Sequence, residues 1–278
     1  MTETISKTYA RAMTIATSDS GGGAGVQADL KTFSALGCFG TSVLAALTAQ
    51  NTHEVRGIEA MPPDFVSLQI DTVLDDIGTD AVKIGMLFNG KIMEVVAERL
   101  KAHNVQKVVL DPVMVAKSGA KLIKDEAIET IKDALFPLST VITPNLPEAE
   151  TLLGTNISDQ SEMEAAARKL LDLGPHAVLL KGGHFSNQKS VDCLVLNAPD
   201  ENGNDLYWYK SERIHTKNTH GTGCTLSSAI AAGLAKGMKL PESVQEAKNY
   251  ITEAIAAGSE YRLGQGHGPL HHFYQSWD

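Results

Sequence analysis

Apolar segments of strand length alternate with segments of helical spacing along most of this chain. The strand-like segments are nearly continuous in apolar residues, which is typical of strands covered on both faces. This alternation predicts an α/β fold with a mostly parallel central sheet and helices on both faces. We expect strands over Met13–Thr17, Gly40–Leu47, Ala81–Ile84, Lys107–Leu110, Val141–Thr143 and Ala177–Leu180.

The segments between these strands carry apolar residues at spacings of three and four, as amphipathic helices do. Ser161 and Glu164 have the spacing of a capping box, which predicts the start of a helix that runs to Leu173. Two segments, Val191–Leu196 and Leu206–Tyr209, should form an antiparallel pair with a turn near residues 202–204. Other helices are expected over Ala24–Leu36, Asp64–Val73, Ile92–Leu100 and roughly 224–236 and 242–258.

The composition fits one sizeable domain. The chain has 278 residues and is 43% hydrophobic, so we expect a single domain over residues 12–278 behind a flexible tail at residues 1–11. The formal net charge is -9 and no basic stripe is present. Nucleic acid and anionic membrane surfaces are therefore not expected as partners.

The cysteines and the first residues predict the compartment. Cys38, Cys193 and Cys224 are widely separated and form no CxxC pair, which favours reduced thiols in the cytoplasm. Residues 1–12 lack the apolar core of a signal peptide. No apolar run approaches the roughly 20 residues that span a bilayer. We therefore expect a cytoplasmic protein.

Polar residues or glycines follow most of the expected strands. In open parallel sheets, ligands bind at the carboxyl ends of the strands. Polar turns would account for many of these residues, but less readily for Asp111 and Lys181, which are charged and directly follow buried runs. The residues at the strand ends are Asp19, Gln50, Gly85, Met86, Asp111, Asn145, Lys181 and the loop before Cys224.

The loop Asn218–Thr225 (NTHGTGCT) has the composition of an anion site. Its glycines precede a helical pattern, so several backbone N–H groups should point the same way at a helix N-terminus. The alternative is a glycine-containing cap in front of a packed helix. Gly221, Thr222 and Gly223 are the residues that would hold the anion.

The earlier cluster Gly21–Gly25 (GGGAG) also follows a strand and opens a helix. Its spacing is not that of a dinucleotide fingerprint, the second strand ends without an acidic residue, and no Gly-Lys-Ser/Thr follows. We expect it to let the backbone, including Gly23, and Asp29 approach a small substrate.

Gln50 could recognise a heterocycle. Its carboxamide offers an acceptor and a donor in one plane, which match a ring nitrogen beside an amino group. The alternative is a solvated or turn-capping glutamine.

Asp111, Asn145 and Glu148 could organise Mg²⁺ through water and phosphate oxygens, and Lys181 could neutralise phosphate charge. The alternatives are a solvated first-turn Glu148 and a surface Lys181. Adjacent His271 and His272 cannot easily share one metal ion. His184 and His220 lie in loops near the expected site, but their spacing assigns neither a ligand role.

Several segments together resemble the hydroxymethylpyrimidine/phosphomethylpyrimidine kinases of thiamin synthesis, in the ribokinase-like superfamily. They lie between about residues 13 and 274. The resemblance implies a ribokinase-like three-layer sandwich, a homodimer, and ATP- and Mg²⁺-dependent phosphorylation of 4-amino-5-hydroxymethyl-2-methylpyrimidine and then of its monophosphate. The matching segments are Gly22–Ser34, Gln50–Thr52, Lys83–Leu87, Asp111–Gly119, Ile142–Ala149, Lys181–His184, Thr216–Ser227 and Gly268–Phe273.

The resemblance also implies roles for matching positions. Residues 221–224 would form the anion hole. The pyrimidine would contact Gly23, Asp29, Gln50, Met86, Val113 and Cys224. The nucleotide and the metal would be surrounded by Asp111, Asn145, Glu148, Lys181, Thr216 and Lys248, with Asp111 and Glu148 reaching Mg²⁺ through water.

Cys224 is the candidate base for the hydroxymethyl group. A thiol at a helix N-terminus should have a lowered pKa, and the wider superfamily resemblance implies an Asp base here. The alternative is that Cys224 only shapes the pocket.

Three positions bear on how close the resemblance is. Many members carry Gly and Ser where this chain has Thr17 and Gly21, and some carry Glu at position 50. Two other activities stay open: a pyridoxal kinase of the same family, and a non-catalytic nucleotide sensor on the same fold.

Overall fold

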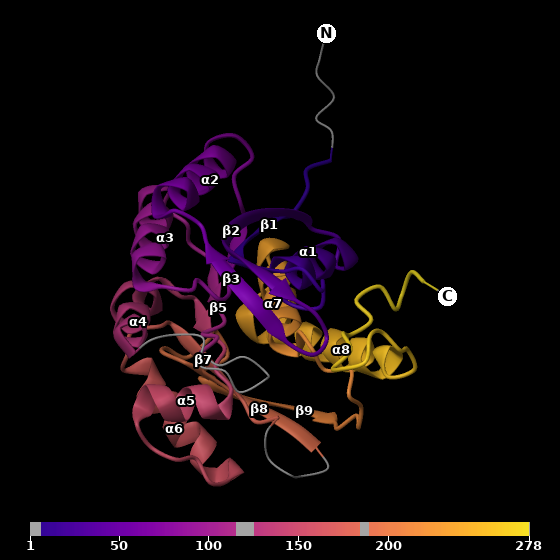
Figure 1. Cartoon of the computed structure of the whole chain (residues 1–278). Helices are drawn as coiled ribbons and strands as arrows, with labels where there is room; N and C mark the ends of the chain where they lie inside the picture. The colour runs from indigo at the N-terminus through magenta and orange to yellow at the C-terminus, as the bar shows by residue number, and fades with distance from the viewer. Residues whose placement is uncertain (1–6, 115–124, 184–188, 278) are drawn as a thin grey trace.

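The computed structural model describes residues 7–114, 125–183 and 189–277. In these ranges nine strands form one sheet in the order β3-β2-β1-β4-β5-β6-β7-β8-β9 (Figure 1). The parallel strands are β1 (Arg11–Asp19), β2 (Phe39–Gln50), β4 (Ala81–Ile84), β5 (Val108–Leu110), β6 (Val141–Ile142) and β7 (Ala177–Lys181). Three antiparallel strands, β3 (Val55–Ala60), β8 (Lys189–Leu196) and β9 (Leu206–Glu212), lie at the edges. The expected mostly parallel α/β sheet is confirmed.

Helices cover both faces of the sheet (Figure 1). On one face lie α2 (Pro63–Asp76), α3 (Gly90–Ala102), α4 (Asp125–Thr130), α5 (Leu146–Leu153) and α6 (Met163–Leu171); on the other lie α1 (Gly25–Ala35), α7 (Thr222–Ala235) and α8 (Leu240–Gly258). Side chains of each strand alternate between two cores. Val82 and Ile84 join the first core, and Ala81 joins the second. The result is a three-layer sandwich.

β3 was not expected from the sequence. Its residues alternate between half-buried and exposed, with Arg56 and Glu59 pointing to solvent. An edge strand that packs on one side lacks the continuous apolar run that marks the central strands. Its pairing with β2 extends that strand to Gln50.

The predicted capping box at Ser161 was wrong. Asp159 caps this segment instead, accepting from the Ser161 N–H at 2.7 Å at the start of a 3₁₀ turn that precedes α6. A complete capping box stands at α5, where Asn145 accepts from the Glu148 N–H at 2.9 Å and Glu148 accepts from the Asn145 N–H at 2.8 Å. Helices α4 and α5 were not among the expected elements.

The turn before β9 agrees with the sequence, whereas the start of β1 does not. Gly203 takes a positive φ of 81° in the expected turn before β9. Arg11, which we assigned to the tail, begins β1, and its guanidinium bonds Asp80 at 2.7 Å. Residues 1–6 of the expected tail lie outside the described ranges. Within those ranges no helix is long and apolar enough to cross a bilayer.

Candidate active site

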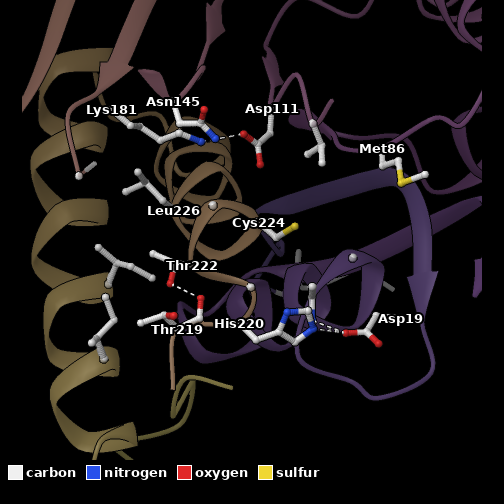
Figure 2. Close-up of a pocket in the computed structure, with 18 of the residues that line it drawn as sticks. Asp19, Met86, Asp111, Asn145, Lys181, Thr219, His220, Thr222, Cys224 and Leu226 are labelled. Carbon is white, nitrogen blue, oxygen red and sulfur yellow. Dashed lines mark hydrogen bonds and ion pairs between the residues drawn. The ribbon is translucent and has the colours of Figure 1, made fainter. Parts of the chain in front are cut away.

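A cavity of about 740 Å³ lies at the carboxyl ends of the parallel strands, beside the first turn of α7 and against α8 (Figure 2). Asp19, Gln50, Asp111 and Lys181 reach it from strand ends, and α7 points its first turn at it. The predicted site residues that line it are Gln50, Met86, Val113, Asp111, Asn145, Glu148, Lys181, Gly221, Thr222, Gly223, Cys224 and Lys248. Gly23, Asp29 and Thr216 are not part of this lining.

The glycine loop before α7 has the geometry of an anion site. Gly221 is the N-cap with φ of 82°, a conformation that favours glycine, and a Cβ there would lie 1.8 Å from the Gly23 carbonyl oxygen. Thr222 begins the helix and donates its hydroxyl to the Thr219 carbonyl at 2.8 Å. The first-turn N–H groups of a helix have no partners within the helix. Here the Thr222 N–H bonds the Thr219 carbonyl at 3.4 Å, and residues 221–224 line the cavity.

Lys181 and Asp111 form an ion pair beside this loop. Lys181 Nζ lies 2.9 Å from Asp111 Oδ1, which also accepts from the Thr143 hydroxyl at 3.1 Å. A Cβ on Gly223 would lie 3.3 Å from Asp111 Oδ2, so the second oxygen faces the glycine loop. Burial lowers the pKa of Lys181, but Asp111 and Glu148 raise it more, and the net shift is upward. Lys181 therefore carries its positive charge at neutral pH.

Glu148 is the second carboxylate at this edge. Burial raises its pKa to about 7, although Lys181 acts in the opposite direction. Its carboxylate also closes the capping box of α5, so its position is fixed by the helix start. Burial therefore favours the protonated form of Glu148.

The donor set fits Mg²⁺ held partly by other ligands. Among the residues that the structure describes, no group of three or more His, Cys, Asp or Glu could hold a metal. Asp111 and Glu148 provide hard oxygen atoms, which Mg²⁺ prefers, and Mg²⁺ usually keeps several waters and substrate phosphates. Two carboxylates beside an anion loop suit that arrangement.

The pKa predicted for Cys224 was wrong. Burial raises the pKa of the thiol to about 11, and Lys83 lowers it only partly. The N–H of Gly25 also bonds the sulfur. Desolvation outweighs the effect of the helix N-terminus. Cys224 is therefore protonated at neutral pH.

Asp29 lies behind the cavity wall. Its oxygens accept two bonds of 2.9 Å from Lys83, one of 2.6 Å from Thr14 and one of 2.7 Å from Ser228. Lys83, in contrast, lines the cavity. The position in the cavity lining that we expected for Asp29 is thus taken by Lys83, its ion-pair partner.

The other two residues outside the lining support nearby backbone. Gly23 donates its N–H to Asp19 Oδ2 at 3.1 Å, and a Cβ there would lie 2.5 Å from the ring of His220. The Gly21–Gly25 cluster thus packs against the anion loop. Thr216 accepts from the Asn218 N–H at 3.1 Å.

Lys248 reaches the far end of the cavity from α8. It bonds Asp192 at 2.6 Å and Ser190 at 3.0 Å, and both it and Asp192 are buried. Sequence reasoning considered charged residues at strand ends, and it missed Asp192 because that residue lies inside the apolar strand β8. The same signal, a charged residue within an apolar run, could have identified Lys83 as well as Asp192.

Comparison with known proteins is consistent across most of the chain. The family model for phosphomethylpyrimidine kinase matches residues 19–271. The hydroxymethylpyrimidine/phosphomethylpyrimidine kinase of Escherichia coli is 47% identical, with 96% of this chain and 98% of that protein covered. The thiamine biosynthesis bifunctional protein ThiED of Geobacter sulfurreducens is 52% identical over 96% of this chain, which spans only 53% of that longer protein.

Solved structures share the fold. Phosphomethylpyrimidine kinase from Clostridium difficile is 45% identical and aligns with a TM-score of 0.77 over 88% of this chain and 99% of its own. An ADP complex of Bacillus subtilis pyridoxal kinase is 37% identical, with a TM-score of 0.88 over 98% of this chain and 100% of its own. The fold is therefore the ribokinase-like sandwich expected above, and the chain belongs to the phosphomethylpyrimidine kinase family.

Proposed function

We propose that this protein phosphorylates 4-amino-5-hydroxymethyl-2-methylpyrimidine with ATP, and then phosphorylates the monophosphate, in thiamin synthesis. The observation that carries the proposal is the single cavity shared by Gln50, the glycine loop and the Lys181–Asp111 pair. It brings a heterocycle-binding amide and an anion site to one open cavity. The names of the relatives support the same substrates.

Phosphoryl transfer depends on alignment and charge neutralisation more than on covalent chemistry by the protein. The N–H groups of residues 221–224 would hold the transferring phosphoryl group, and the Lys181 ammonium would offset its charge. Gln50, Met86 and Val113 would orient the pyrimidine so that its hydroxymethyl oxygen, or its first phosphate, attacks the γ-phosphorus in line. The bond from that phosphorus to ADP breaks, ADP leaves, and the hydroxyl proton passes to water. Because the Cys224 thiol is protonated at neutral pH, we assign it to the wall of the substrate site.

The nucleotide would lie toward Asn145, Thr216 and Lys248. Asp111 and Glu148 would hold Mg²⁺ through water, and the ion when bound would neutralise phosphate charge. We also propose a homodimer in the cytoplasm, which the family resemblance favours.

A pyridoxal kinase is the second candidate, since a pyridoxal kinase from Staphylococcus aureus in complex with an ATP analogue and pyridoxal aligns with a TM-score of 0.85 at 33% identity. Gln50 favours the aminopyrimidine, because its amide complements an amino group beside a ring nitrogen.

ATP turnover measured in parallel with the pyrimidine, its monophosphate and pyridoxal tests the proposal. We expect kcat/KM to be highest for the two pyrimidines. A higher value for pyridoxal would reverse the order of the candidates. No turnover with any of the three would favour the nucleotide sensor.

A further inference from the structure

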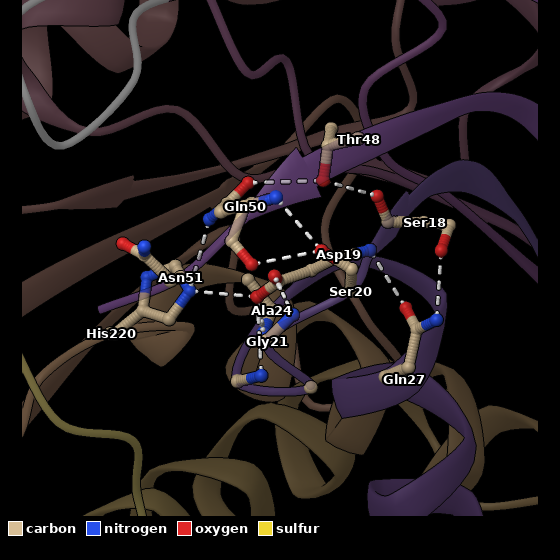
Figure 3. A network of polar contacts seen from close by, with 12 residues as sticks. Ser18, Asp19, Ser20, Gly21, Ala24, Gln27, Thr48, Gln50, Asn51 and His220 are labelled. Carbon is tan, nitrogen blue, oxygen red and sulfur yellow. Dashed lines mark hydrogen bonds and ion pairs between the residues drawn. The ribbon is translucent and has the colours of Figure 1, made fainter. Parts of the chain in front are cut away.

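His220 joins three separate segments of the cavity wall (Figure 3). Its Nε2 lies 2.8 Å from Asp19 Oδ2 at the end of β1 and 3.2 Å from the amide nitrogen of Gln50 at the end of β2. The residue itself directly precedes Gly221, the N-cap of α7. A change in this ring would therefore reach both the substrate-facing amide of Gln50 and the glycine loop before α7.

Asp19 determines where the ring carries its proton. Its oxygens accept from the N–H groups of Gly21 at 2.8 Å, Gly23 at 3.1 Å and Ala24 at 2.9 Å. Burial raises the pKa of Asp19, but the bonds from His220 and Gly21 lower it more, so the net shift is downward. An ionised carboxylate can only accept hydrogen bonds, and therefore Nε2 of His220 carries a hydrogen.

The backbone holds the ring in place. The His220 N–H donates to the Gly268 carbonyl at 3.0 Å, and residue 220 forms an isolated bridge with Pro269. On the other side, Gly23 packs so closely that a Cβ there would lie 2.5 Å from Cδ2 of the ring. The Nε2–H group thus has a fixed position beside the Gln50 amide.

A fixed donor has a consequence for the orientation of that amide. Because Nε2 of His220 donates its one hydrogen to Asp19, it has no lone pair with which to accept from the Gln50 NH₂. A half-turn about the last side-chain bond exchanges the oxygen and nitrogen of Gln50 and places the oxygen on the ring side, where it can share that hydrogen. The amide NH₂ then faces the Thr48 hydroxyl, which lies 3.4 Å from the opposite end of the amide. Thr48 can accept there because it donates its own hydrogen to the Ser18 carbonyl at 2.9 Å.

We propose that His220, held by Asp19, is a positioning residue that selects the orientation of the Gln50 amide and thereby the ring that the site prefers. One lone pair and one N–H of Gln50 remain for a ligand in this arrangement. The remaining lone pair and the remaining N–H of Gln50 therefore have fixed positions. They match a ring that presents an amino group beside a ring nitrogen better than they match a pyridine. This inference rests on the proposed function and adds the means of discrimination.

Steady-state kinetics of His220→Leu, with the pyrimidine and ATP varied separately, tests the role. Loss of one oriented hydrogen bond is expected to raise the pyrimidine KM about tenfold, and the ATP KM should stay within about twofold because the glycine loop keeps its backbone bonds. His220→Gln restores a donor near the Nε2 position and should recover most of the lost affinity. The preference for the pyrimidine over pyridoxal should shrink in parallel with the rise in KM.

The matched control is His103→Leu, which removes another histidine–aspartate pair of 2.8 Å, between His103 and Asp71, away from the cavity lining. It should leave both KM values unchanged. Thermal melting of each variant shows whether folding is retained.

A double-variant cycle separates positioning from a structural role. If His220 acts through Gln50, then adding His220→Leu to Gln50→Ala changes the pyrimidine KM less than about twofold further. Additive effects, or a fall in kcat with a raised ATP KM, would overturn the inference and make His220 a support of the glycine loop. If the wild type turns over none of the substrates, it is the proposed function that fails.

Discussion

Three buried lysine–aspartate pairs border the same cavity. Two of them, Lys83–Asp29 and Lys181–Asp111, differ in how many hydrogen bonds the aspartate has already accepted. Lys83 bonds both oxygens of Asp29, and Thr14 and Ser228 supply two further bonds. Both side chains of this pair are 0% exposed. The carboxylate is saturated by the protein and has no capacity left for a ligand.

The second pair keeps an oxygen for the cavity. In the Lys181–Asp111 pair, both the lysine and Thr143 bond Oδ1. Oδ2 faces Gly223 in the anion loop, and Lys181 retains 14% side-chain exposure. Ion pairs of similar length thus serve different ends: the saturated one stabilises the packing of α1 against the sheet, and the other is available to phosphate and metal.

The comparison is tested most strongly by Lys83→Met. Removing one partner of a fully buried ion pair leaves an uncompensated charge, which costs about 3–5 kcal/mol in the free energy of unfolding. Urea denaturation measures this loss. Lys83→Met combined with Asp29→Leu removes both charges and should recover much of the stability. A loss below about 1 kcal/mol in the single variant would contradict the structural role.

Lys181→Met should act mainly on catalysis. If Lys181 stabilises the transferring phosphoryl group as proposed, loss of its charge reduces kcat by about 10²–10³-fold. The loss of unfolding free energy should be smaller than for Lys83→Met, because the site borders an open cavity. Lys239→Met, which removes an exposed lysine paired with Glu201, is the control and should keep full kcat. If Lys181→Met instead unfolds the protein as severely as Lys83→Met, the two pairs are equivalent.

The pH dependence of stability gives a further test through Glu148, which lies beside the Lys181–Asp111 pair. Its pKa in the folded protein is raised from 4.5 to about 7 by burial, so between these values the folded state binds a proton more strongly than the unfolded state. The stabilising contribution is complete below pH about 4.5 and is lost as pH rises through about 7. Urea unfolding at pH 5 and pH 8 should show a decline in stability that is smaller in Glu148→Gln. An equal decline in both proteins would show that Glu148 is not the group that titrates.

The contrast between the pairs also explains what could be predicted from the sequence. The parallel sheet, its strand ends and the anion loop follow from apolar runs and glycine positions, which are local signals. Asp111 and Lys181 were identified because each follows a buried strand. Whether Asp29 was saturated was not predictable, since its partners Lys83, Thr14 and Ser228 come from three separate elements.

Two further features of the structure were not predicted from the sequence for the same reason. The edge strand β3 packs on one side only and gives a weak apolar pattern. The bond between Asp19 and His220 joins residues 201 positions apart, and no spacing rule reaches across that distance. Local chemistry predicted which residues gather at the cavity, while the non-local contacts decide which of their polar groups remain unoccupied there.

Cys224 lies within the influence of both pairs and gives the smallest expected effect. Lys83 lowers the pKa of its thiol, Asp29 and Asp111 raise it, and burial dominates, with a result of about 11. A general base typically contributes about 10²–10⁴-fold to the rate. Because this thiol is protonated at neutral pH, Cys224→Ala should lower kcat by less than about tenfold.

Alkylation by iodoacetamide gives a second measure of the same thiol. Since the thiolate is the nucleophile, the rate at Cys224 should be low at pH 7 and rise steeply above pH 9, and pyrimidine binding should slow it. Cys224→Ala identifies the portion of the alkylation that belongs to this site. A kcat loss beyond about 10²-fold in a folded Cys224→Ala protein would return the role of base to Cys224. In that event the saturated Lys83–Asp29 pair would take part in catalysis through the thiol, and the division between the two pairs would fail.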